Sequence, residues 1–316
     1  MANEVTYSGL ETGGLRVDKV ITAEVHMLLK DSASLRNTPY FINAGSINGT
    51  GTDTLRYRLA GLGGYDSFTS RTEIQAATNT DLSKAFVDIA VSRASLQRDI
   101  SDLASLTAYG QSVVDPFVLA SDMVQSYEKY FAELTGATIQ NFTTVLGDAT
   151  AAFDLNAVFE GIAHLQSAAN PAGEQAGSAG PFVCVLSPEA WNDLQSDLQG
   201  QTNTFFAYNT ADHEMLKIKG ENYVGNFLGI DFYKSAHVDS AASAWQNGMW
   251  SRGALAYATG VPQNLIGAAA QQNLGEVVVE MSRVSDQAIS RITGHCYLGM
   301  AVVDDARGCI LRSIDN

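Results

Sequence analysis

The sequence predicts an α+β protein organised around one long helix and one projecting hairpin. Three observations support this class. Between residues 112 and 136 the apolar residues recur every three or four positions, which is the period of one helical face. Residues 54–59 alternate between apolar and charged, which is the period of a strand with one polar face. After residue 147, helical and strand patterns follow one another to the end of the chain.

The composition is that of a folded protein with an acidic balance. Of its 316 residues 46% are hydrophobic and 17% are charged, and the formal net charge is −15. No run of basic residues offers a docking surface for duplex DNA or anionic lipid, so sequence-specific nucleic-acid binding is not expected. The low charged fraction fits either a surface buried against other subunits or simply a neutral surface, and both remain open.

The sequence carries no signal for a membrane or for secretion. No apolar run approaches about 18 residues, and the N-terminus lacks the basic-then-apolar pattern of a signal peptide. We therefore expect a protein that is made and kept in a cytoplasm. Cys184, Cys296 and Cys309 lie far apart among apolar residues, which favours small core side chains over disulfides or metal ligands.

The first half of the chain begins with an arm and a hairpin. Residues 1–36 show no sustained periodicity, and the segment 19–29 fits a short helix or a strand, so we interpret this region as an extended arm ordered by outside contacts. Leu55, Tyr57 and Leu59 mark one strand of the hairpin, and residues 87–91 mark its return. The irregular, glycine-rich tip at 60–81 is long for a compact domain. A hairpin that leaves its own core needs partner surface elsewhere, and the alternative is a flexible surface loop.

Two helices are expected next. Residues 94–108 carry Leu96, Ile100, Leu103 and Leu106 at helical spacing. The long helix then begins near Asp115-Pro116, because proline is tolerated in the first turn, and we expect it to end at Gly136. At 1.5 Å per residue it would be about 30 Å long. Its apolar face consists of Val113, Phe117, Ala120, Val124, Tyr127, Phe131 and Leu134.

The remainder reads as an α+β body. Asp154 can cap a helix whose apolar face carries Leu155, Phe159, Ile162 and Leu165. The apolar run 182–186 predicts a buried strand, and Ser187-Pro188 then starts a helix that carries Trp191, Leu194 and Leu198. Residues 199–214 form a polar loop that contains Phe205 and Phe206. Further strands are expected at 229–234, 249–250, 254–258 and 277–281, and a final strand at 297–303 closes the chain.

No motif for catalysis or for a cofactor is present. The sequence lacks a phosphate-binding loop, a dinucleotide fingerprint, a zinc or calcium pattern and a nucleophile elbow. The five histidines are isolated from one another, and a Ser-His-Asp set that assembles only in space remains open. Asp304-Asp305 follows a strand, where a turn explains the pair as well as chemistry does. We expect no enzyme, no cofactor and no metal.

Taken in order, these segments resemble the tailed-bacteriophage major capsid proteins of the Hong Kong 97-like fold. Residues 1–36 look like the N-arm, and 37–92 look like the E-loop. SRASLQRDISDLASL and the long helix, within 93–147, are similar to the P-domain with its spine helix. The segment 148–275, with its FVCVLSPEAW step, is similar to the A-domain. VVVEMSRVSD, within 276–296, looks like the P-domain strand, and 297–316 would return to the A-domain.

This resemblance implies a structural shell subunit. Pentamers and hexamers would form through the A-domains and close into an icosahedral head around double-stranded DNA, which is held without sequence-specific contacts. The chain would be located in the virion after assembly in the host cytoplasm, with a portal, a separate scaffolding protein and possible decoration protein as partners and no membrane. The residues implied are, in the E-loop, Tyr57, Leu59, Tyr65 and Phe68, in the spine helix Phe117, Val124, Tyr127 and Phe131, and at the capsomer axis Phe205 and Phe206.

The chain departs from this family in two respects. Some members have a long scaffolding segment ahead of the arm, whereas only about 110 residues precede the spine helix here, so we expect scaffolding to come from a separate protein or to be unnecessary. No lysine lies in the 60–81 tip for the covalent cross-link that some members form. Three rival classes also stay open. An encapsulin-type compartment shell shares the fold, a cytoplasmic hydrolase would assemble its site in space, and a tail tube or fibre subunit would form rods. The size of the shell, its triangulation number and the host are not readable from the sequence.

Overall fold

The computed structural model describes residues 40–62, 84–102, 116–167, 181–200, 209–210, 222–241, 243–260 and 277–315, with residues 25, 27, 28, 36, 38 and 219. The helices in this part of the chain are α4 (Pro116–Ile139), α5 (Leu155–Ser167) and α7 (Pro188–Gly200), with a short 3₁₀ turn at Asp305–Arg307. The strands that surround them form two sheets and a ribbon, which confirms the α+β class.

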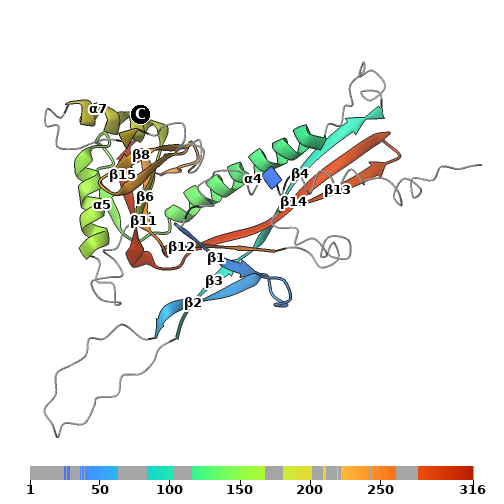
Figure 1. Cartoon of the computed structure of the whole chain (residues 1–316), viewed down its shortest axis with the longest axis horizontal. Coiled ribbons are helices and arrows are strands. Elements are labelled where there is room, and N and C mark those ends of the chain that lie inside the picture. Colours follow the sequence, from blue (N-terminus) through green and yellow to red (C-terminus); the bar gives the residue numbers. More distant parts are fainter. Residues whose placement is uncertain are drawn as a thin grey trace, which may run out of the picture.

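The five-stranded sheet has the order β1-β12-β14-β13, and β4 also pairs with β14. Its strands are β1 (Phe41–Ser46), β4 (Ser92–Ser101), β12 (Leu255–Thr259), β13 (Val277–Val284) and β14 (Ile289–Val302). The 14 residues of β14 let it pair with β12 near its end and with both β4 and β13 along its first half. Figure 1 shows the result, an arm of β4, β14 and β13 that extends away from the body.

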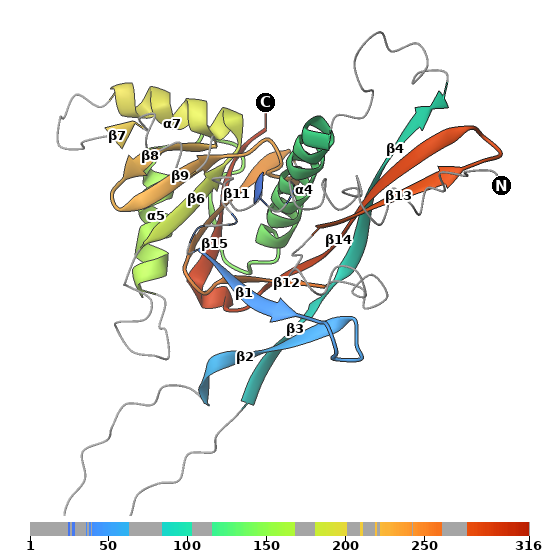
Figure 2. The same cartoon turned by 45° about the vertical axis from the view of Figure 1, so that its right-hand side comes forward.

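The eight-stranded sheet forms the body and has the order β5-β15-β11-β6-β9-β8-β7, with β10 on β11. Its first strands are β5 (Val145–Gly147), β6 (Phe182–Leu186), β7 (Asn209–Thr210) and β8 (Tyr223–Phe227). The others are β9 (Ile230–Lys234), β10 (Ser240–Ala241), β11 (Ala244–Ser251) and β15 (Gly308–Ile314). The ribbon, β2 (Thr54–Leu62) with β3 (Lys84–Ala90), pairs with neither sheet, and its base packs against the five-stranded sheet (Figure 2).

The eight-stranded sheet is covered on both faces. In β6, Cys184 belongs to the core formed with α5 and α7, whereas Val183 and Val185 belong to the core formed with α4 and the five-stranded sheet. This alternation is that of a strand buried on both sides, and it explains why its sequence is apolar throughout. The predicted strand at 182–186 is confirmed. Cys184 and Cys309 are buried free thiols, as expected, and Cys296 is half-buried.

The long helix is confirmed, but its predicted end at Gly136 is wrong. Helix α4 continues to Ile139. A side chain on Gly136 would collide with the backbone carbonyl of His237, so glycine is required there for the close approach of a neighbouring segment and does not terminate the helix. Of the predicted apolar face, Ala120, Val124 and Tyr127 are buried, as is Phe131. Residues 112–115 lie outside the described part.

The predicted helix at 94–108 is wrong for the part that the structure describes. Residues 92–101 form β4, which pairs with β14 over its whole length. Leu96 and Ile100 are four positions apart, a spacing that fits both one helical face and one face of a strand. The half-buried positions Ala94, Leu96 and Ile100 follow the strand alternation, and the long-range pairing decides the conformation.

The predicted helix starts in the body are confirmed. The Asp154 carboxylate accepts a 2.9 Å hydrogen bond from the Ala157 amide at the start of α5, and the Ser187 hydroxyl accepts from the Ala190 amide at the start of α7. Phe159 was expected on the apolar face of α5, but Val158 is buried in its place and Phe159 is exposed.

The end of the chain contains more strand than predicted. The expected strand at 297–303 is the second half of β14, and it does not close the chain, because β15 follows and lies between β11 and β5. The chain therefore crosses from the five-stranded sheet back into the eight-stranded sheet in its last residues.

Candidate functional site

The ribbon is the first surface that could engage a partner. Leu55 and Ile89 pair at its base and pack with Ala256, Ala258 and Val303 of the five-stranded sheet. Farther out, Tyr57 is half-buried against this same cluster of its own chain. The side chain of Leu59, and Tyr65 and Phe68 as a whole, lie outside the described residues. The pairing ends at Leu62 and Lys84, which stand opposite each other.

The second face of the ribbon is exposed and carries an aromatic side chain. Arg56 donates two hydrogen bonds to the Asp88 carboxylate, at 2.8 and 3.0 Å, and these bonds lower the pKa of Asp88. The Arg56 guanidinium also lies over the ring of Phe86, 5.7 Å from its centroid, and Phe86 is 44% exposed. A two-stranded ribbon with an exposed apolar side chain is marginal alone and is stabilised by contact with another surface.

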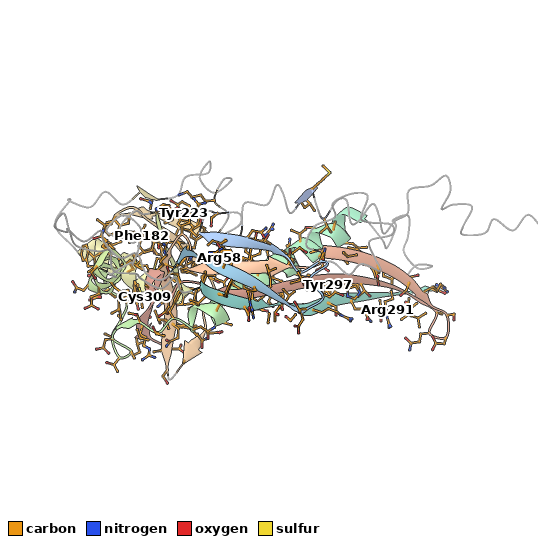
Figure 3. All side chains as sticks on the ribbon, turned by 90° about the horizontal axis from the view of Figure 1, so that it is seen from below. Arg58, Phe182, Tyr223, Arg291, Tyr297 and Cys309 are labelled. Carbon is orange, nitrogen blue, oxygen red and sulfur yellow. The ribbon has the colours of Figure 1, made fainter. Side chains whose placement is uncertain are left out.

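The arm is held together by paired arginine and aspartate side chains. Arg98 on β4 bonds Asp122 on α4 at 3.0 and 3.1 Å, and so ties the sheet to the helix. Asp99 pairs with Arg291 across β4 and β14 in the same two-bond manner. In Figure 3, Arg58 lies on the ribbon, Arg291 lies far along the arm, and Cys309 and Tyr223 lie in the body.

The predicted spine residues form the core of their own chain. Phe131 is 2% exposed and meets the rings of Phe41 and Tyr257 edge-on, with centroids 5.2 and 5.7 Å away. Tyr127 is buried beneath the guanidinium of Arg36, 5.5 Å from its ring centroid. The predicted side chain of Phe117 is not among those described. The predicted axis loop with Phe205 and Phe206 also lies outside the described residues.

A shallow groove separates α4 from the arm. It encloses about 170 Å³ between Met123, Tyr127 and Tyr130 of the helix and the strand residues beneath them. Gly294 forms part of its floor, and a side chain there would press against the sulfur of Met123 at 3.2 Å. His295 also lines the groove, with its Nε2 3.5 Å from a carboxylate oxygen of Glu280.

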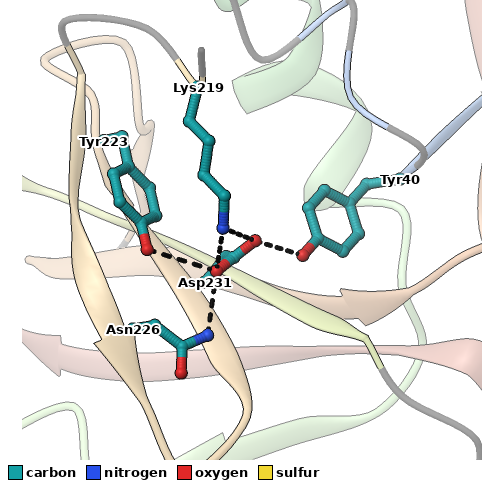
Figure 4. Close-up of polar contacts among 5 residues, drawn as sticks. All are labelled: Tyr40, Lys219, Tyr223, Asn226 and Asp231. Atoms are coloured by element: carbon teal, nitrogen blue, oxygen red, sulfur yellow. Dashed lines mark hydrogen bonds and ion pairs between the residues drawn. The ribbon is translucent and has the colours of Figure 1, made fainter. Parts of the chain in front are cut away.

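A buried polar cluster surrounds Asp231 on β9 (Figure 4). The residue is 7% exposed, and both of its carboxylate oxygens accept hydrogen bonds. The Tyr40 hydroxyl donates to one oxygen at 2.6 Å, and the Lys219 ammonium lies 2.7 Å from each. Asn226 and Tyr223, both on β8, donate to the other oxygen at 2.9 and 3.4 Å.

This arrangement keeps Asp231 ionised. Burial alone would raise its pKa, but the hydrogen bonds from Lys219, Tyr40 and Asn226, together with the charge of Lys219, outweigh burial and leave the pKa lowered. Burial and the bond to Asp231 raise the pKa of Tyr40, so its hydroxyl stays a donor. Among the described residues, the site is therefore an ion pair in which both carboxylate oxygens are bonded by protein donors.

The described residues offer little support for a hydrolase. His237 lies 3.8 Å from Glu133, and His295 is paired with Glu280 on another element, so these histidines do not gather in one site. No group of three His, Cys, Asp or Glu side chains within the described ranges could hold a metal ion. None of the helices that the structure describes has the length and apolarity needed to cross a membrane.

Comparison with known proteins gives matches at the level of structure. No protein-family model matches the sequence, and no curated protein matches it. The capsid of Ralstonia phage GP4 has a TM-score of 0.61 at 10% identity and covers 91% of this chain and 91% of that chain. The capsid of Cyanophage P-SCSP1u has a TM-score of 0.56 at 13% identity, with 90% and 89% covered. The holo-SrpI encapsulin complex from Synechococcus elongatus has a TM-score of 0.53 at 11% identity, with 98% and 95% covered.

These likenesses establish the fold. The chain has the fold of capsid and encapsulin shell proteins, and the match runs over most of its length in each case. The sequence resemblance is thereby confirmed for the capsid fold. The sequence analysis did not predict the Asp231 cluster, whose signal in the sequence was a single acidic residue inside the mainly apolar strand 230–234.

Proposed function

We propose that this protein is the major capsid subunit of a tailed bacteriophage, which assembles through pentamers and hexamers into an icosahedral head around double-stranded DNA. The likeness to the phage GP4 capsid over 91% of both chains is the observation that supports this proposal most directly. In this assignment, 1–36 is the N-arm, 37–92 the E-loop, 93–147 the P-domain with its spine helix, and 148–275 the A-domain. Residues 276–296 add the P-domain strand, and 297–316 return to the A-domain.

The proposed role of the ribbon is to bind a neighbouring subunit. The ribbon packs against its own chain through Leu55, Tyr57 and Ile89, and its other face carries the exposed ring of Phe86. In a shell, Tyr57, Leu59, Tyr65 and Phe68 would lie over the P-domain of the neighbour, where the apolar area lost to water stabilises the contact. Phe205 and Phe206 would face the axis of each ring of five or six subunits.

The proposed partners follow from the same assignment. The shell would enclose DNA without binding it tightly, because the net charge of −15 gives few groups that could neutralise phosphates. A portal and a separate scaffolding protein would be needed for assembly, and a decoration protein could reinforce a shell that lacks a cross-linking lysine at the E-loop tip. The protein would be located in the virion, after assembly in the host cytoplasm.

An encapsulin-type compartment is the second candidate. The structural match with the SrpI encapsulin covers 98% of this chain and 95% of the encapsulin chain, and is therefore as extensive as the matches with phage capsids. The two candidates share self-assembly and differ in what the shell encloses, a cargo protein or DNA.

The test is electron microscopy and sedimentation of the chain expressed alone. Closed shells tens of nanometres wide, or rings of five or six subunits, support the capsid class. Shells that carry a co-purified host protein favour the encapsulin, and rings that close only when a scaffolding protein is added favour the phage head. A chain that stays monomeric even with the products of its neighbouring genes would overturn both candidates.

A further inference from the structure

The Asp231 carboxylate joins its own strand to two other segments, one at Tyr40, 191 residues away in the sequence, and one at Lys219, 12 residues away. Tyr40 comes immediately before β1, a strand of the five-stranded sheet. Lys219 comes before β8, and Asp231 itself lies in β9 of the eight-stranded sheet. Figure 4 shows Tyr40 and Lys219 approaching the carboxylate from two different segments of the chain. One side chain therefore connects the start of one sheet to the interior of the other.

The two contacts from outside strands β8 and β9 are the shortest, and the bond from Asn226 on β8 follows at 2.9 Å. Tyr40 and Lys219 lie 2.6 and 2.7 Å from the carboxylate oxygens, whereas Tyr223, on the strand next to β9, lies 3.4 Å away. Tyr40 and Lys219 also share one oxygen, since both are bonded to Oδ2. A carboxylate that is 7% exposed depends on such donors, because water cannot replace them.

The position of Lys219 therefore depends on Tyr40. The Tyr40 bond fixes the rotation of the carboxylate, and that rotation places both oxygens at equal distance from the ammonium. The ammonium also lies 4.6 Å from the centroid of the Tyr223 ring, so its place is narrowly defined. Without the Tyr40 bond, Oδ2 keeps only the Lys219 ammonium as a donor, so the carboxylate is held less tightly in the rotation that places the ammonium between its two oxygens.

We propose that Asp231 is a conformational coupler, through which Tyr40, directly before β1, and Lys219, ahead of β8, are held on the sheet together and released together. The inference concerns the folded subunit alone and does not depend on whether the chain forms shells. It predicts a reciprocal effect, because a coupling free energy between two sites acts equally in both directions.

The test is hydrogen exchange, followed by mass spectrometry, on the unassembled chain and on two variants. Tyr40→Phe removes one hydroxyl, and we expect amide exchange in peptides that cover 222–227 to rise about fivefold or more. Lys219→Met keeps the length of the side chain and removes its charge, and exchange in peptides that cover 41–46 should rise by a similar factor. In the double variant, the rise should be smaller than the product of the two single rises.

Tyr223→Phe is the matched control. It removes the same hydroxyl group from the same carboxylate, but at 3.4 Å and from within the sheet, so exchange at 41–46 should stay unchanged. The coupler is ruled out if Tyr40→Phe alters exchange only near residue 40, or if it raises exchange by the same factor in peptides throughout the chain, as a general loss of stability would. It is also ruled out if Tyr223→Phe produces the same distant effect as Tyr40→Phe. A chain that shows the coupling but stays monomeric even with the products of its neighbouring genes would overturn the proposed function and leave this inference intact.

Discussion

The buried carboxylate of Asp231 is stable only because nearby side chains supply a positive charge and hydrogen-bond donors. Its neighbours in β9 are apolar and buried, and its own carboxylate is compensated by one cation and several neutral donors. Because the donors favour the charged form, the folded-state pKa lies below the value of about 3.9 found in unfolded chains. The group therefore stabilises the fold above about pH 4, and this contribution is lost as the pH falls through the folded-state pKa.

Asp231→Asn should reveal this contribution as a pH-dependent loss of stability. At pH 7 we expect the free energy of unfolding to fall by about 2 to 3 kcal/mol, because Lys219 loses its partner in a largely buried site. The difference between wild type and variant should shrink as the pH is lowered from about 4 through the folded-state pKa of Asp231, because the wild-type carboxylate then takes up a proton. Urea unfolding at a series of pH values measures both. A difference that is the same at pH 7 and pH 3 would contradict the ionised state of Asp231.

Two tyrosines near this cluster should respond in opposite ways to the same substitution. The buried hydroxyl of Tyr233 has no hydrogen-bond partner in the described structure, so Tyr233→Phe should leave stability unchanged or raise it by about 1 kcal/mol. Tyr40→Phe removes a 2.6 Å bond to a charged acceptor and should lower stability by about 2 kcal/mol. Thermal unfolding of the two variants side by side tests the pair. Equal destabilisation by both would mean that Tyr233 has a partner after all.

At the scale of elements, local sequence patterns correctly predicted those features that depend on contacts between residues close together in the sequence. The helix starts at Asp154 and Ser187 were correct because a capping side chain acts within one turn of the chain. The helix predicted for 94–108 was wrong over 94–101, because the apolar spacing there fits a helix and a strand, and pairing with β14, almost 200 residues away, selects the strand. The predicted end of α4 was wrong for a related reason, since the glycine at 136 is needed for the close approach of the distant His237 backbone and does not mark the end of the helix.

Gly136→Ala should destabilise the protein, although helix propensity alone predicts the reverse. Alanine is more favourable than glycine inside a helix by about 1 kcal/mol, but here its Cβ would collide with the His237 carbonyl, and we expect a net loss of about 1 to 2 kcal/mol. The adjacent Ala137 is exposed, so Ala137→Gly should show the propensity term alone, a loss of about 1 kcal/mol. Chemical denaturation measures both. A more stable Gly136→Ala would show that the backbone near residue 237 moves aside freely.

At the scale of the whole molecule, the sequence predicted the order of the parts better than their pairing. The long helix, the ribbon and the α+β body appear in the expected sequence, because each has its own periodicity. The crossing of the last residues into the eight-stranded sheet was missed, since strand partners are selected by long-range contacts that leave no local pattern. The Asp231 cluster was missed for the same reason, because Tyr40 and Asp231 are 191 positions apart.

The ribbon gives the sharpest test of how the whole molecule works, because it can be shortened without disturbing its base. Leu62 and Lys84 stand opposite each other, so residues 63–83 can be replaced by an Asn-Gly turn, which matches the twist of two paired strands. Leu55 and Ile89 keep their contacts with the five-stranded sheet. We therefore expect the melting temperature of the unassembled chain to change by no more than about 2 °C, whereas the fraction that forms shells falls below detection.

Two comparisons make this result interpretable. Circular dichroism and sedimentation of the shortened chain show whether it remains a folded subunit, and mixing it with full-length chain shows whether it can accept a neighbour's ribbon while offering none. Shells that form from the shortened chain alone, at the normal size, would contradict the role of the ribbon in assembly. Partial shells from the mixture would support it, because each contact needs a ribbon from one subunit and a surface on the next, and the shortened chain lacks only the first.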